Sequence, residues 1–154
     1  ISENNMAAGA TKAFNDAVLK TRKGVYAEGD TWQLVFLSDT YASIDTDLTN
    51  PTSASFTPVV GGNVAASYTL ASITIDRVTN VIKFDAADIG QILKNASNPA
   101  DLKTALLRNA TVTNDAIQAW DMTTDGTASL DLINNDFTFS FGAGGINTST
   151  NQSA

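Results

Sequence analysis

The most constraining feature of this sequence is a series of short segments in which apolar and polar residues alternate. The clearest one lies near the C-terminal end, where Thr138 and Ser140 separate Phe137, Phe139 and Phe141. Because successive side chains of a β-strand point to opposite faces of a sheet, this spacing predicts a strand with one buried face and one solvated face. A chain built from such segments buries its apolar residues by packing sheet faces together.

Similar runs recur between turn-forming residues, about eight in all. They include residues 32–37, 56–60, 67–78, 81–84, 116–121, 130–132 and 137–141. Residues 32–37 are apolar on both faces, which predicts a central strand. Thr79 and Asn80 separate two runs and predict a hairpin, whereas Pro58 places its run at an edge or a bulge. The segments that fit either a strand or a helix are residues 85–97 and 102–109.

One helix is expected near the N-terminal end, over residues 6–20. Its apolar residues have helical spacing and form a narrow face: Ala10, Phe14, Ala17 and Val18. Basic residues follow at the C-terminal end of this segment, where the helix dipole favours cations. Gly24 is a natural stop for the helix.

These patterns predict a mostly β protein, an antiparallel β-sandwich or jelly roll (or a small barrel) of about eight short strands with a short N-terminal α-helix. The 154 residues suit one domain. We expect an N-terminal extension with the helix over residues 1–24 and a β-sandwich domain over residues 25–146. Residues 147–154 are expected to form a polar C-terminal tail.

The chain contains no cysteine and no histidine. Disulfides, thiolate metal sites, histidine-ligated zinc and Ser-His-Asp or Cys-His catalysis are therefore excluded within it. We accordingly predict no catalytic residue, no metal site and no cofactor, and expect that the protein is not an enzyme.

The formal net charge is −7, from 9 basic and 16 acidic residues. An acidic chain repels phosphate backbones and anionic lipids, so we predict neither a nucleic-acid nor a membrane partner. No apolar stretch approaches the ~18 residues that span a bilayer. Residues 1–5 also lack the basic and apolar regions of a secretory signal peptide.

Carboxylates gather at three places that bear on calcium binding or glycoside hydrolysis: Asp45 with Asp47, Asp85 with Asp88, and Asp121 with Asp125. None has the spacing of an EF-hand, and nothing selects a catalytic pair, so we interpret them as aspartates that cap turns. Residues 142–145 are glycine-rich but lack the Lys and Ser/Thr of a P-loop, which predicts a flexible exit from the last strand. Trp32 and Trp120 are assigned to the core, although tryptophan is also frequent at interfaces.

Basic residues concentrate around the predicted helix of this acidic chain, and the C-terminal end is polar. The predicted partner-binding residues are Lys12, Phe14, Lys20, Arg22, Lys23, Asn147 and Asn151. The basic group suits an acidic partner surface, or it is simply the solvated end of a helix. Polar chain ends are segments that a neighbouring molecule can order.

Four stretches occur in a notable order: residues 6–15, 30–39, 95–101 and 135–146. They comprise a short N-terminal helix, an early strand that begins Trp32-Gln33-Leu34, an Asn-x-x-x-Pro turn and a last aromatic strand that ends in G-x-G-G-I. This order resembles small structural proteins of tailed bacteriophage virions, most of all a capsid decoration (cement) protein. The resemblance brings no catalytic residues.

The resemblance implies a β-sandwich or jelly-roll protein that is made in the host cytoplasm and located on the capsid surface of the virion. Its partner would be the major capsid protein, whose neighbouring subunits it would cement, with self-association on the shell. An alternative is a tail-associated or receptor- or carbohydrate-binding β-sandwich module of a phage virion. A carboxylate-based glycosidase is a third hypothesis.

Overall fold

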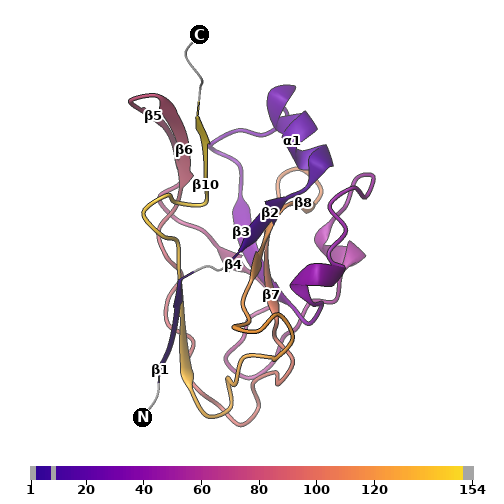
Figure 1. The fold of residues 1–154 in the computed structure, drawn as a ribbon, viewed down its shortest axis with the longest axis vertical. Helices are drawn as coiled ribbons and strands as arrows, with labels where there is room; N and C mark the ends of the chain where they lie inside the picture. Colours follow the sequence, from indigo (N-terminus) through magenta and orange to yellow (C-terminus); the bar gives the residue numbers. More distant parts are fainter. Residues whose placement is uncertain (1–2, 8–9, 151–154) are drawn as a thin grey trace.

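The computed structural model describes residues 3–7 and 10–150, which are mostly β, as the sequence predicts (Figure 1). The strands are β1 (Glu3–Ala7), β2 (Thr11–Ala13), β3 (Trp32–Leu37), β4 (Tyr68–Thr69), β5 (Thr74–Val78), β6 (Val81–Asp85), β7 (Thr104–Asn109), β8 (Asp115–Asp121), β9 (Asp136–Ser140) and β10 (Asn147–Thr150). The α-helix is α1 (Asn15–Arg22), and the short 3-10 helices are η1 (Tyr41–Ser43) and η2 (Ser53–Ser55). Two antiparallel sheets and one parallel strand pair give an arrangement consistent with a β-sandwich.

The larger sheet has five strands in the order β2-β8-β7-β3-β4. In β3 every side chain except that of Gln33 is buried, which confirms the predicted central strand. Residues 102–109, which fitted either a strand or a helix, contain strand β7, paired with both β3 and β8. Its register shifts between Leu107 and Arg108, a local irregularity of the β7–β8 ladder.

The smaller sheet has the order β10-β6-β5. Strands β5 and β6 form the predicted hairpin, in which Thr79 takes a left-handed φ of 55°. β10 pairs with the other side of β6, with Asn147 opposite Phe84. In Figure 1 this sheet stands at the same end of the molecule as α1.

The core lies where β9 packs on the larger sheet. Phe137 and Phe139 of β9 are fully buried, as their alternation predicts. The ring of Phe137 lies 5.9 Å from that of Phe36 in β3, and the ring of Phe139 lies 5.8 Å from that of Trp120 in β8. β9 also pairs in parallel with β1, a departure from the all-antiparallel expectation.

The predicted helix over residues 6–20 is wrong over its first half. Residues 3–7 and 11–13 are strands, and α1 begins at Asn15. Thr11 pairs with Trp120, and the backbone N–H of Phe14 donates to the carbonyl of Ile117 at 3.1 Å, so sheet pairing satisfies the backbone before the helix starts. The helical spacing of the apolar residues was thus overridden by long-range β pairing.

Three further expectations differ from the structure. Residues 56–60 make a single bridge, from Pro58 to Leu37, and residues 130–132 form no strand. Residues 147–150 form β10, so the first half of the predicted polar tail belongs to a sheet. Strands from both terminal segments therefore pair with strands of residues 25–146. Among the described residues, no helix has the length and apolarity needed to cross a membrane.

Candidate protein-docking groove

A cavity of about 560 Å³ lies between α1 and β10, and we call it the α1–β10 groove. In Figure 1 these two elements stand near one another at the upper end of the molecule. The residues that line the groove come from β2, α1, β8 and β10: Ala13, Ala17, Val18, Thr21, Arg22, Ile117, Gln118, Asn147, Thr148 and Ser149. The groove thus joins residues from both ends of the chain.

The apolar part of the groove is formed by short side chains. Ala17 and Ile117 are buried, Ala13 is exposed, and Val18 is 40% exposed. Arg22 is the one charged residue among the described lining residues, and it is exposed. No described carboxylate lies within ion-pair distance of its guanidinium. The groove therefore combines a small apolar surface with an unneutralised cation.

Gln118 holds the start of β10 against β8. Its Nε2 donates to the carbonyl of Ile146 and to the hydroxyl of Thr11, both at 2.8 Å. Its Oε1 accepts from the side-chain amide of Asn147 at 2.9 Å. Because Gln118 is almost fully buried, these bonds replace those it would make with water and fix the position of β10.

The turn before β10 requires glycine. Gly145 has a φ of +67°, and its N–H donates to the carbonyl of Gly142 at 2.8 Å. A Cβ at position 145 would lie 2.6 Å from the carbonyl oxygen of Phe84. The chain needs both a left-handed conformation and a close approach to β6 here, which glycine alone supplies without strain.

The outer edge of β10 is unprotected. Among the described residues, β10 has a partner strand on its β6 side alone, and Asn147, Thr148 and Ser149 are exposed. It carries no charge and no proline. The other edges of the antiparallel sheets are blunted, since β5 carries Asp76 and Arg77, β2 is three residues long with a lysine, and β4 has two residues.

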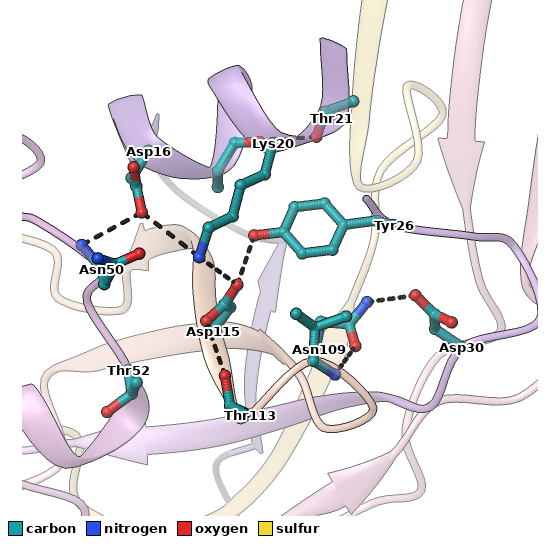
Figure 2. A network of polar contacts seen from close by, with 12 residues as sticks. Asp16, Lys20, Thr21, Tyr26, Asp30, Asn50, Thr52, Asn109, Thr113 and Asp115 are labelled. Atoms are coloured by element: carbon teal, nitrogen blue, oxygen red, sulfur yellow. Dashed lines mark hydrogen bonds and ion pairs between the residues drawn. The ribbon is translucent and has the colours of Figure 1, made fainter. Parts of the chain in front are cut away.

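A polar cluster attaches α1 to the larger sheet (Figure 2). Asp115 lies at the start of β8, and its side chain is 4% exposed. It accepts from Lys20 Nζ at 2.8 Å and from the Tyr26 hydroxyl at 2.9 Å. Lys20 also lies 3.5 Å from Asp16 one turn earlier in the helix, which in turn accepts from the backbone N–H of Asn50.

Tyr26 and Lys20 of this cluster both bind their protons more tightly than the free side chains do. Burial, together with the hydrogen bond to Asp115, raises the pKa of the Tyr26 hydroxyl far above its ordinary value. Burial alone would lower the pKa of Lys20, but the hydrogen bond and charge of Asp115 outweigh it, so the pKa of Lys20 is raised. Both groups are therefore protonated near neutrality, where neither acts as a base, and the cluster serves to anchor the helix.

The structure separates the predicted partner-binding residues. Arg22 and Asn147 both line the α1–β10 groove, and Lys23 is exposed just beyond the helix. Lys20 is engaged by Asp115, and Lys12 donates to the carbonyl of Tyr41 at 2.6 Å.

Phe14 requires a correction. It is fully buried, with its ring 5.6 Å from that of Phe56, so it belongs to the core and offers no surface to a partner. Phe14 lies in extended backbone just before α1, and its N–H donates to the carbonyl of Ile117 in β8, so the chain carries its ring into the core. Asn151, the last of the predicted contacts, lies outside the described residues.

The carboxylates singled out in the sequence accept hydrogen bonds from backbone N–H groups, except Asp47, which accepts from the side-chain amide of Asn15. Asp45, Asp121 and Asp125 each accept from the backbone N–H two residues later, as turn-capping aspartates do. Asp85 is paired with Lys83 at 2.7 Å, and Asp88 accepts from the N–H of Phe141. No group of three or more metal-ligating side chains occurs within residues 3–7 and 10–150.

Both tryptophans are buried, which confirms their assignment to the core. Gln118 and Asp115, which fix the walls of the groove, were not predicted from the sequence. The available signal at Gln118 was a single polar residue within an apolar run. Thr148 and Ser149 were not predicted either, since a polar edge strand carries no hydrophobic period.

Comparison with models of known protein families, with curated proteins and with solved structures gave no match.

Proposed function

We propose that this chain is a structural protein that binds other proteins through the α1–β10 groove, as a decoration (cement) component on the capsid surface of a tailed bacteriophage. The observation that carries the binding role is the groove itself. It combines a strand edge and an Arg22 guanidinium that have no partner among the described residues with a partly apolar base, on a chain whose net charge is −7. Such a surface suits attachment to a partner by packing, strand pairing and charge complementarity.

The assignment to a capsid is supported by the sequence resemblance to phage virion proteins. A cement protein that binds across neighbouring major capsid subunits stabilises the assembled shell, because binding to the assembled state alone shifts the equilibrium toward it. The fixed attachment of α1 by Asp115 and of β10 by Gln118 supports this role, since it keeps the groove walls in place before binding.

The test is the protein content of particles released by cells that carry this coding sequence. We expect quantitative mass spectrometry to find the protein in many copies per particle, and cryo-electron microscopy to place it on the head. Particles depleted of the protein should also lose their DNA at a lower temperature than complete particles. Absence of the protein from purified particles would refute the proposal.

The same particles distinguish the alternative hypothesis. A location on the tail, with binding of the isolated protein to a glycan array, would favour a receptor- or carbohydrate-binding module over a cement protein. Retention on tail-free heads would exclude that alternative.

A further inference from the structure

We infer that the α1–β10 groove binds an extended, acidic segment of the partner protein, which adds to the smaller sheet as a strand beside β10. This inference rests on the proposed binding function and names the chemistry of the partner. It makes the groove a site of β-augmentation, in which backbone hydrogen bonds supply affinity and side-chain contacts supply specificity.

The two edges of the smaller sheet, β5 and β10, differ in how they are protected against strand pairing. An edge strand presents unpaired N–H and C=O groups, and native proteins usually blunt such edges with charges, proline or short length. β5, at the other side of the same sheet, carries Asp76 and Arg77 in this way. β10, with the sequence Asn-Thr-Ser-Thr, carries neither a charge nor a proline. Among the described residues nothing pairs with its outer edge, which is thus available to an added strand.

The groove carries a positive charge opposite β10. Arg22 projects from the last turn of α1 into the lining of the groove, and no described carboxylate neutralises it. A strand seated on β10 would run between β10 and this side chain. A carboxylate on that strand would form an ion pair with Arg22 that no described residue of this chain forms.

The apolar residues that line the groove are Ala13, Ala17, Val18 and Ile117, so its apolar surface is small and one layer of apolar side chains would cover it. One face of a β-strand supplies such a layer. The favoured occupant is therefore a strand that carries small or β-branched apolar residues and at least one Asp or Glu.

The experiment uses a library of random peptides about twelve residues long, enough to form a strand along β10 and reach the helix. The library is selected on the full chain and on three variants: Arg22→Glu, Ser149→Asp and Ser149→Asn. Both positions are exposed, so each variant is expected to fold, and circular dichroism with thermal unfolding verifies this. Ser149→Asn is the matched uncharged control for Ser149→Asp.

We expect the natural chain to enrich peptides in which acidic residues alternate with β-branched residues. Arg22→Glu should weaken the best peptide by about tenfold and reverse the preference toward basic peptides. Ser149→Asp should abolish binding, because its carboxylate repels the peptide and competes for Arg22, whereas Ser149→Asn should bind normally. Hydrogen exchange of the best complex should slow at the amides of residues 147–149.

Several outcomes would overturn the inference: no enrichment, an unchanged charge preference in Arg22→Glu, or equal binding by the two Ser149 variants. A dimer of the natural chain that Ser149→Asp dissociates would assign the edge to a second copy instead. Binding of the natural chain and of Ser149→Asp to particles distinguishes failure of this inference from failure of the proposed function. If Ser149→Asp decorates particles as well as the natural chain does, strand addition is wrong and the structural role stands. If the natural chain is absent from particles, the proposed function fails whatever the peptides show.

Discussion

Lys20 in α1 and Asp115 at the start of β8 form an ion pair of 2.8 Å between residues 95 positions apart in the sequence. The pair crosses from the helix to the larger sheet, and Tyr26 shares the same carboxylate oxygen. The orientation of α1, and with it one wall of the α1–β10 groove, depends on this contact.

Replacing Asp115 should therefore destabilise the fold. In Asp115→Asn, Lys20 keeps its charge but loses its strongest partner, and we expect the free energy of unfolding to fall by about 2–3 kcal/mol. The nearby carboxylate of Asp16 limits the loss. Urea denaturation at neutral pH measures it. Asp76→Asn, at an exposed position of β5, is the control and should change stability by less than about 0.5 kcal/mol. Equal losses in the two variants would show that Asp115 does not anchor the helix.

The same cluster should control stability at high pH. The pKa of Tyr26 is raised by burial and by its hydrogen bond to Asp115, so the folded state binds this proton more tightly than the unfolded state does. That contribution is complete below the unfolded tyrosine pKa of about 10 and is lost as the pH rises beyond it. Tyr26→Phe should flatten the fall of stability above about pH 10. Urea titrations across pH 8–11 would contradict the assignment if both proteins lost stability in parallel.

Any residue other than glycine at position 145 should lower the stability of the fold. Gly145→Ala places a Cβ against the carbonyl of Phe84 and strains a left-handed backbone, at a cost of about 1–3 kcal/mol. Gly144→Ala is a neighbouring control, because nothing lies within 4 Å of its added Cβ. Thermal unfolding compares the two variants. We also expect Gly145→Ala to weaken peptide binding, because the added Cβ displaces β10. If Gly145→Ala is as stable as the natural chain and binds the peptide equally well, the close approach of residue 145 to the carbonyl of Phe84 is refuted.

The reassignment of Phe14 to the core has a direct test. Phe14→Ala removes a fully buried ring and should cost about 3–5 kcal/mol of stability. Leu19→Ala, on the same helix at a side chain that is 49% exposed, should cost much less. Calorimetric unfolding of both variants decides the matter. A loss of partner binding by Phe14→Ala with native stability would restore the original prediction of a contact residue.

Local pattern was sufficient to predict several buried strands of the fold, although it left the buried strand β7 open between strand and helix. The alternating phenylalanines of β9, the apolar run of β3 and the hairpin at Thr79 each carry their own signal, because the burial that defines them follows the period of a strand. Interior strands are visible in a sequence for this reason, and edge strands with polar side chains are not. β10 consists of polar residues, so nothing in residues 147–150 indicated a strand.

The N-terminal strands were not predicted from the sequence for a different reason. The stretch around Ala10, Phe14 and Ala17 has helical spacing, yet residues 11–13 pair with β8. Local preference amounts to fractions of a kcal/mol per residue, and pairing with a distant strand outweighs it. The groove could not be predicted from the sequence, because its walls come from β2, α1, β8 and β10, and a local sequence pattern does not show which distant elements lie side by side. Arg22 and Asn147 were chosen as contact residues on charge and polarity, and their role in binding stays a prediction.

The pairing of β2 with β8 has a consequence for biosynthesis. The hydroxyl of Thr11 donates to the carbonyl of Ala119, 108 residues later, so this edge of the larger sheet can close only after residue 119 has been synthesised. The base of the groove then waits for Ile146 and β10 to reach Gln118. A chain in which β10 has not yet paired therefore displays no complete groove. A partner that recognises this surface would bind a chain only after β10 has formed.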